Sequence, residues 1–272
     1  MSTAAPLRPL FRWTGGKRWL VPRLLALVPE TYGRYYEPFL GGGALYFALR
    51  PRQARLGDKN LELINAYECI RDDPEQVGRL LRGMSRDETN YYRVRGQRPR
   101  ARFRRAARTV YLTTLAFNGI YRVNKRGLFN VPFGGRDYPD LGSAEVLKGY
   151  AEALQGAELE ATDFTATLRD AAAGDLVYLD PPYTVAHSNN GFLKYNAKIF
   201  LLEDQEKLAE TASELAKRGC HVIVSNAFHA SIGNLYRGFR AVEVRRRSVM
   251  AASADHRKEV TEYLFTTPLE DV

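Results

Sequence analysis

The residues best suited to chemistry are Asp180, Pro181, Pro182 and Tyr183, which directly follow the apolar run Leu176–Leu179. An ionised carboxylate is a strong hydrogen-bond acceptor, and consecutive prolines present carbonyls in a stiff segment without N–H donors. Two such acceptors on the N–H bonds of a conjugated amine would localise its lone pair, and the tyrosine ring offers a face for stacking. We interpret these four residues as catalytic. An ordinary strand-ending turn is the alternative, because prolines and acids favour turns.

A glycine turn is the second candidate site. Gly41 and the two glycines after it lie between a predicted strand and a predicted helix within residues 33–49. Such a turn lets the backbone approach a ligand, and the helix N-terminus offers free N–H groups. Asp58 ends a second predicted strand, residues 54–60, where an acid can accept hydrogen bonds from ribose hydroxyls. Tyr46 replaces the third glycine of the dinucleotide fingerprint, so the turn favours another adenosine cofactor over a nicotinamide.

Both sites need a sheet to position them. Apolar or alternating runs predict strands at residues 176–180, 221–226 and 260–267, with a helix at 202–219 between the first two. Ligands of open α/β sheets bind at the carboxyl ends of the strands, so we expect Asp180 and the glycine turn at one edge. The sequence predicts an α/β fold with a mostly helical insertion. Residues 1–60 and 148–272 would form the catalytic domain, and residues 61–147 the insertion.

The charge balance indicates a polyanionic partner. The chain has 40 basic and 31 acidic residues, a net charge of +9 and a pI near 9.5, and such a basic excess favours nucleic acid. Arginines crowd the insertion, at Arg79, Arg82, Arg86, Arg93, Arg95, Arg98, Arg100, Arg102, Arg104, Arg105 and Arg108. A solvated helix face would give the same pattern, so the charge alone leaves both interpretations open.

Several classes of protein are disfavoured. No apolar run approaches the roughly 20 residues that span a bilayer, and the first residues lack the apolar region of a secretory signal. We therefore expect a cytoplasmic protein without a membrane partner. Cys69 and Cys220 are far apart in sequence, and the four histidines have no metal-ligand spacing. We expect neither a disulfide nor a bound metal.

Four motifs together resemble one family, the Dam-type DNA adenine-N6 methyltransferases of the α class. They are RWTGGK at residues 12–17, EPFLGGG at 37–43, GDKN at 57–60 and DPPY at 180–183. The resemblance covers nearly the whole chain. It implies a Rossmann-like methyltransferase sheet, an inserted DNA-recognition domain, S-adenosylmethionine as cofactor, and methylation of adenine N6 in duplex DNA by base flipping. It further implies that the cofactor is bound by Trp13, Lys17, Glu37, Phe39, Gly41, Asp58 and Asp180.

Residues 117–135 resemble the target-recognition hairpin of the same family. The resemblance implies DNA contacts by Arg12, Phe117, Asn118, Ile120, Arg122 and Asn124. Phe117 would wedge into the base stack and Asn118 would hold a phosphate. Ile120 and Arg122 would approach base edges, as an aliphatic side chain suits a thymine methyl and an arginine suits guanine O6 and N7. The expected target is GATC. The remaining arginines, including those from 100 to 108, are assigned to phosphates.

Other readings stay open. The same chemistry could act at a different DNA sequence or on cytosine N4, and a DNA-binding protein could keep the fold without the chemistry. The intact Asp180 and Lys17 argue against a retired enzyme, and Tyr46 argues against a nicotinamide-dependent dehydrogenase. The loop His187–Phe200 could close over a flipped base or be a mobile surface loop. We expect double-stranded DNA as partner, a monomer, and a cognate restriction endonuclease if the enzyme belongs to a restriction-modification system.

Overall fold

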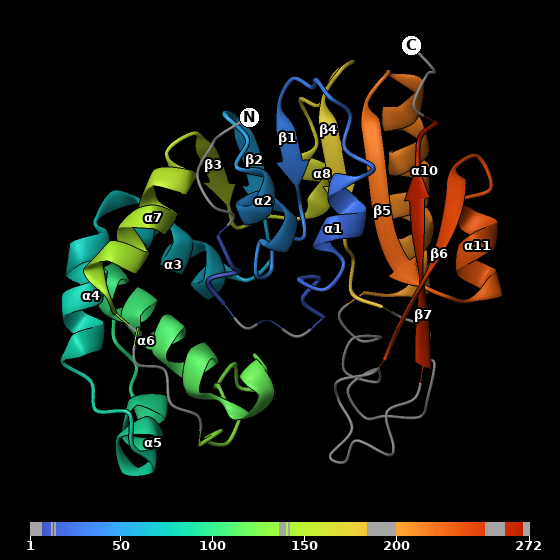
Figure 1. Cartoon of the computed structure of the whole chain (residues 1–272). Helices are drawn as coiled ribbons and strands as arrows, with labels where there is room; N and C mark the ends of the chain where they lie inside the picture. The colour runs from blue at the N-terminus through green and yellow to red at the C-terminus, as the bar shows by residue number, and fades with distance from the viewer. Residues whose placement is uncertain are drawn as a thin grey trace. The chain divides into compact units, whose positions relative to one another are not determined.

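The computed structural model of this chain describes residues 7–11, 13, 15–135, 140, 142–183, 200–247 and 259–268 (Figure 1). The chain forms two compact units. Unit 1 comprises Met1–Leu25 and Leu40–Thr167, and unit 2 comprises Ala26–Phe39 and Leu168–Val272. Within the described part of the chain, no helix combines the length and the apolar character needed to span a bilayer.

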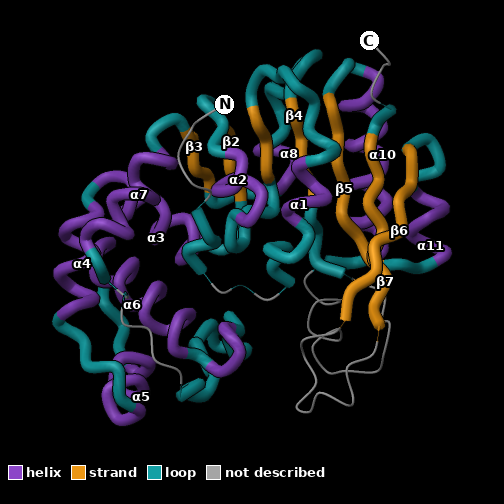
Figure 2. The backbone as a smooth tube through the Cα atoms, in the orientation of Figure 1, coloured by secondary structure: helices purple, strands orange, loops and turns teal. Residues whose placement is uncertain are grey.

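Unit 2 is built on five strands, which lie side by side in Figure 2. Their order is β1 (Tyr35–Glu37), β4 (Leu176–Leu179), β5 (His221–Ala227), β7 (Glu259–Thr266) and β6 (Arg240–Arg247). Strands β1, β4 and β5 are parallel neighbours, whereas β7 is antiparallel to both β5 and β6. The parallel strands therefore have their carboxyl ends at one edge.

Burial explains why these segments form the centre of the sheet. All four residues of β4 are buried, and so is β5 from Val222 onward, as expected of parallel strands that are covered on both faces. Helix α10 (Leu202–Lys217) connects β4 to β5 and buries an apolar stripe that includes Leu208, Ala212 and Leu215. The short helix α11 (Ala230–Leu235) follows β5.

Unit 1 combines a parallel strand pair with a helical region. The pair is β2 (Ala54–Gly57) and β3 (Ala157–Glu160). Three short helices belong to this unit: α1 (Val21–Leu25), α2 (Ala44–Leu49) and α8 (Phe164–Thr167). The helical region comprises α3 (Leu61–Asp72), α4 (Pro74–Arg82), α5 (Glu88–Gly96), α6 (Arg102–Leu115), the 3₁₀ turn η1 (Phe117–Gly119) and α7 (Ala144–Leu154).

Local sequence sets where these helices begin. The side chains of Asn60, Asp73, Asp87 and Ser143 each accept a hydrogen bond from a backbone N–H in the first turn of α3, α4, α5 and α7, respectively. Such caps satisfy donors that a helix end otherwise leaves unpaired. Helices α3, α4 and α6 pack against one another, α7 packs on α3 and α4, and α5 packs on α6 (Figure 1).

The predicted fold class is confirmed: the protein is α/β, with a mostly helical segment between β2 and β3. The predicted strands at 54–60, 176–180, 221–226 and 260–267 and the helix at 202–219 are present within one to three residues. Strand β3 was not predicted, because its four residues, AELE, are too short to establish a pattern. The assignment of 1–60 with 148–272 and of 61–147 as domains stays a prediction.

Candidate functional site

Asp180 is fixed at the carboxyl end of β4 by the neighbouring strand. Ser225 on β5 donates its hydroxyl proton to Asp180 Oδ1 over 2.7 Å, and the Tyr178 hydroxyl lies 3.0 Å from the Ser225 oxygen. Ser225 is completely buried, whereas Asp180 is half-buried, so the donor of this hydrogen bond is fixed within the sheet and can set the carboxylate orientation. A carboxylate has about four acceptor positions, and this contact occupies one of them.

The backbone after Asp180 is held at Pro182 by α10. The fully buried Gln205 donates from Nε2 to the Pro182 carbonyl over 3.2 Å. Asn226, which is also fully buried, donates to Gln205 Oε1 over 3.0 Å and so orients its amide. The rigidity that the sequence indicates through its prolines is therefore supplemented by a buried amide pair from two other elements.

Tyr183 is anchored through its hydroxyl group. It donates to Glu262 Oε2 over 2.7 Å, and Glu262, on β7, is only 2% exposed. Burial, followed by the carboxylates of Glu262 and Asp180, raises the pKa of Tyr183 well above its usual value. The tyrosine therefore stays a neutral donor, and its hydroxyl position is set by a strand that lies 79 residues away in sequence.

Glu37 and Phe39 follow the neighbouring strand β1. The pairing of Tyr36 with Val177 makes β1 and β4 parallel, so Glu37 lies at the same edge of unit 2 as Asp180. Glu37 is 2% exposed and accepts a hydrogen bond from the Tyr35 hydroxyl over 2.8 Å. Phe39 is half-buried and meets Phe200 edge-to-face at 5.7 Å. Two carboxylates, Glu37 and Asp180, thus end adjacent parallel strands.

The glycine turn of unit 1 is tied to Asp58. Asp58 Oδ2 accepts from the Gly41 N–H over 3.0 Å, and Oδ1 accepts from the Asn60 N–H over 2.8 Å. On the other side of the turn, the buried Tyr67 hydroxyl donates to the Gly41 carbonyl over 2.9 Å. Burial raises the pKa of Asp58, and the two backbone donors oppose that rise. The backbone of the turn is therefore held from both sides, by Asp58 and by Tyr67.

Trp13 and Lys17 also belong to this part of unit 1. A Cβ atom at Gly41 would lie 2.8 Å from Trp13 Cδ1, which is too close for any side chain, and Gly41 has a φ of 46°. These two facts explain the glycine. Lys17 is only 5% exposed, and its ammonium donates to the Gly15 carbonyl over 3.0 Å. A buried ammonium requires such acceptors, and it suits a ligand that carries a carboxylate.

The hairpin that follows α6 is pinned at its base. Phe117 N–H donates to the Pro132 carbonyl over 2.9 Å, and Gly134 N–H donates to the Leu115 carbonyl over 2.8 Å. Asn118 has a φ of 55°, a left-handed conformation that asparagine tolerates better than most residues. The Phe117 side chain is 50% exposed. The hairpin thus presents an aromatic ring and an amide on a closed loop.

The polar residues of the hairpin orient one another. Arg122 donates from Nε to Asn130 Oδ1 over 2.8 Å, whereas Asn124 Oδ1 accepts from the N–H groups of Arg126 and Leu128 over 2.9 and 3.1 Å. Asn124 therefore builds the turn of the hairpin itself. Ile120 is half-buried, between the buried Gly119 and the half-buried Tyr121.

The structure places most, though not all, of the predicted site residues. Unit 2 brings together Glu37, Asp180 and Tyr183, and unit 1 brings together Trp13, Gly41 and Asp58. Arg12 and residues 187–199 of the predicted loop lie outside the described residues. Sequence reasoning missed Ser225, Gln205, Glu262, Tyr67 and Tyr121. Only the polar pair Ser225–Asn226, at the end of an apolar strand, gave a usable signal.

Three of the arginines assigned to phosphates have partners inside unit 1. Arg102 pairs with Asp72, Arg105 pairs with Glu62 at 2.8 Å, and Arg108 donates to backbone carbonyls at the end of α5. Arg100 and Arg104 have exposed side chains, so their phosphate role stays a prediction. The charge of this segment thus partly stabilises the packing of α3, α5 and α6.

Comparison with known proteins gives consistent results. Residues 13–250 match the family model of the D12 class N6 adenine-specific DNA methyltransferases. The chain is 36% identical over 270 residues to the type II methyltransferase M1.LlaDCHI of Lactococcus lactis subsp. cremoris, covering 96% of this chain and 95% of the relative. It is 31% identical over 263 residues to the DNA adenine methylase of Escherichia coli K12, covering 94% of each. It is 32% identical over 265 residues to the DNA adenine methylase of Vibrio cholerae, with coverage of 94% and 95%.

Proposed function

We propose that this chain, which belongs to the D12 class of N6 adenine-specific DNA methyltransferases, methylates adenine N6 at GATC sites after flipping the base out of the duplex. It is a site-specific DNA adenine methyltransferase by family. The proposal concerns its target sequence, its route to the base, its cofactor and the residues involved. The observation that carries it is the arrangement of Asp180–Tyr183 in unit 2, which we call the acceptor edge. There Ser225 fixes Asp180, and the two prolines that follow stiffen the backbone beside it.

The acceptor edge suits an exocyclic amine. Asp180 would accept one N–H of the adenine amine, and a proline carbonyl would accept the other. The Pro182 carbonyl already accepts from Gln205, which favours the Pro181 carbonyl for this role. Two acceptors draw the nitrogen toward tetrahedral geometry, localise its lone pair, and leave Asp180 positioned to take the proton that is released. This catalysis relies on orientation and electrostatics.

Tyr183 would provide the surface for the flipped base. Its hydroxyl is held by Glu262, so the ring is presented in one orientation, and stacking on such a ring compensates part of the energy of unstacking. On the DNA side, the exposed Phe117 would fill the vacated space and Asn118 would hold a phosphate.

The residues of the two units also suit S-adenosylmethionine. In unit 1, Asp58 and the Gly41 backbone would hold the ribose and adenosine portion, and Trp13 would pack against it. In unit 2, Phe39 would offer a further apolar contact. The buried Lys17 would pair with the carboxylate of the methionine part, and Glu37 would accept from its ammonium group. When bound, this cofactor supplies a methyl group activated by a positive sulfur. No metal enters the proposed mechanism.

GATC is the target that the hairpin supports best. Arg122 is exposed and oriented by Asn130, so its guanidinium can present paired donors to guanine, whereas Ile120 suits a thymine methyl. Asn124 would act indirectly, through the turn that it closes, and Arg12 would contact the first guanine. Since relatives include a type II methyltransferase, a matching restriction endonuclease is the partner we propose. A monomer is sufficient, because the two strands of a palindrome can be methylated one at a time.

The proposed function can be tested with unmethylated DNA. Purified protein and S-adenosylmethionine labelled on the methyl group would be incubated with two duplexes that differ only in carrying GATC or GTAC. Label should appear on adenine N6 of the GATC duplex alone. Equal labelling of both duplexes would contradict the target sequence, whereas labelling of a cytosine would contradict the base. Genome-wide sequencing of methylated sites would then give the recognition sequence directly.

A further inference from the structure

Trp13, from the proposed cofactor site, stacks on Tyr121 of the recognition hairpin. The two ring centroids are 5.1 Å apart and the ring planes are inclined by 23°. Tyr121 lies between Ile120 and Arg122, the two residues expected at base edges. It was not among the predicted site residues. A single aromatic contact therefore connects two parts of unit 1 that are more than 100 residues apart in sequence.

On its other side, Trp13 contacts the glycine turn directly. Its five-membered ring is so close to Gly41 that a Cβ there would meet Cδ1 at 2.8 Å and Nε1 at 3.3 Å. Gly41 in turn is bonded to Asp58 through its N–H and to Tyr67 through its carbonyl. Because interiors are close-packed, any movement of this turn must displace the indole.

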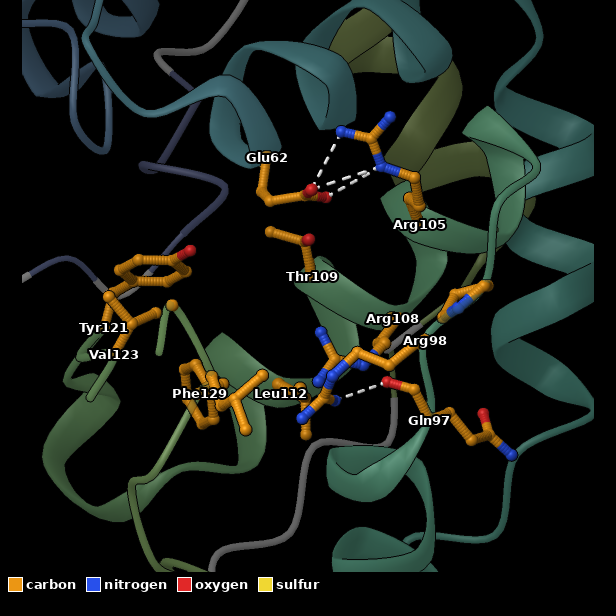
Figure 3. Close-up of a pocket in the computed structure, with 13 residues that line it drawn as sticks. Glu62, Gln97, Arg98, Arg105, Arg108, Thr109, Leu112, Tyr121, Val123 and Phe129 are labelled. Atoms are coloured by element: carbon orange, nitrogen blue, oxygen red, sulfur yellow. Dashed lines mark hydrogen bonds and ion pairs between the residues drawn. The ribbon is translucent and has the colours of Figure 1, made fainter. Parts of the chain in front are cut away.

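On the hairpin side, Tyr121 also packs against the buried core of the hairpin. It meets Phe129 edge-to-face at 5.6 Å, and Phe129 forms a backbone bridge with Val123. Tyr121, Val123 and Phe129 line one side of a cavity of about 170 Å³, and α6 residues including Arg105 and Thr109 line another (Figure 3). The hairpin therefore contacts Trp13 at one face and borders this cavity at another.

We propose that the Trp13–Tyr121 stack couples cofactor binding at the glycine turn to the position of the recognition hairpin, which makes Tyr121 a positioning residue for DNA binding. The proposal rests on the proposed function, since it takes the glycine turn as the cofactor site. A bound cofactor that orders Trp13 fixes Tyr121 and with it the two base-reading neighbours. By linkage, bound DNA must strengthen cofactor binding by the same factor.

The coupling can be measured as a thermodynamic cycle with S-adenosylhomocysteine and a GATC duplex. In the wild type, saturating S-adenosylhomocysteine should lower the Kd for the duplex about threefold to tenfold, a range that one aromatic contact can support. Tyr121→Leu should reduce this factor to less than about twofold, while each Kd measured with the other ligand absent changes by less than about threefold. Tyr121→Phe keeps the ring and should keep the coupling.

The outcomes separate this inference from the proposed function. If the wild type fails to bind S-adenosylhomocysteine, the proposed function is wrong, and the coupling with it. If it binds but the wild type shows no coupling, or Tyr121→Leu keeps the full coupling, only the inference is overturned.

A second measurement does not depend on the stability of Tyr121→Leu. Trp13 and Trp19 are the only tryptophans in the chain, so Trp19→Phe leaves Trp13 as the sole indole fluorophore. The GATC duplex alone, without cofactor, should shift or quench the emission of Trp13, because DNA repositions Tyr121 against it. Unchanged emission under saturating DNA would overturn the proposal.

Discussion

The acceptor edge after β4 and the recognition hairpin after α6 are held in different ways. Asp180, Pro182 and Tyr183 are bonded to buried side chains that lie 45, 23 and 79 residues away in sequence. In the hairpin, the side chains of Arg122 and Asn124 are held by partners only 8, 2 and 4 residues away. The acceptor edge is therefore held by side chains from distant elements of unit 2, whereas the hairpin is held largely by contacts within its own loop.

This difference suggests that the acceptor edge determines the chemistry and the hairpin determines the choice of DNA site. A change at the acceptor edge disturbs buried partners on β5, α10 or β7, so it should affect both turnover and stability. A change in the hairpin is accommodated locally, so it should alter the choice of DNA site while the fold and the chemistry are retained. The two regions therefore predict two kinds of variant.

The largest effect is expected at the acceptor edge itself. Asp180→Ala removes the carboxylate that accepts from the amine, and turnover should fall by at least about 1000-fold, as when a principal electrostatic contact is lost. DNA affinity should change little, because the hairpin and the arginines are untouched. Methyl transfer to a GATC duplex and binding of the same duplex would be measured in parallel.

Asp170→Ala is a matched control for this variant. Asp170 also belongs to unit 2, but its side chain is 60% exposed, and its loss should leave turnover near that of the wild type. Near-normal turnover of Asp180→Ala would show that the amine is activated by other groups.

The hairpin is expected to give the next largest effect, on discrimination between sites. Arg122→Ala should reduce the preference for GATC over duplexes with one altered base pair by about 10-fold to 100-fold, the contribution of one good paired contact to a base. The melting temperature should stay close to that of the wild type. Initial rates on a panel of single-mismatch duplexes would measure the preference.

Arg126→Ala serves as the matched control in the hairpin. Its side chain is exposed and lies four residues from Arg122 in the same loop. A charge effect alone would weaken binding to all duplexes equally and would reduce the salt dependence in both variants. Selective loss of GATC preference in Arg122→Ala distinguishes base recognition from that general effect.

A smaller effect is expected from the support behind Asp180. Ser225→Ala leaves the carboxylate in place but removes the 2.7 Å hydrogen bond that orients it, so kcat should fall about 10-fold while KM for the cofactor is kept. Ser213→Ala is the control, because its hydroxyl donates to the Ala209 carbonyl within α10, away from Asp180. If kcat of Ser225→Ala equals that of the wild type, the orientation of Asp180 is set by other contacts.

The same contrast explains what the sequence could predict. The strands before Asp58 and Asp180 are short extended segments, ARLG and LVYL, each followed directly by an acid, so both the elements and the candidate acids could be located. Gln205 could not be found, since it lies on an amphipathic helix where a buried amide has no distinctive pattern. Glu262 is hidden in the alternating pattern of β7. Tyr121 could not be singled out because its importance depends on its contact with Trp13. A contact between residues more than 100 positions apart leaves no signal in the local spacing of residue types.

The smallest effect is expected for Tyr183→Phe, and it tests whether the acceptor edge is held by a neutral hydroxyl. The ring and its stacking face remain, so turnover should fall only about threefold. The variant loses the hydrogen bond that the Tyr183 hydroxyl donates to Glu262, which should lower the free energy of unfolding at neutral pH by about 1–3 kcal/mol. The pH dependence gives the sharper test. The folded-state pKa of Tyr183 is raised well above its usual value, whereas the unfolded chain releases this proton near pH 10.

Above that pH the unfolded wild-type chain binds fewer protons than the folded chain, so the wild type loses stability on account of Tyr183 as the pH rises, and the variant does not. The difference between the two free energies of unfolding should therefore narrow by about 1.4 kcal/mol between neutral pH and pH 11. Denaturant titrations of both proteins at several pH values would measure it. A difference that stays constant to pH 11 would mean that Tyr183 ionises in the folded protein, and a hydroxyl that ionises beside Glu262 would not hold the ring at the acceptor edge.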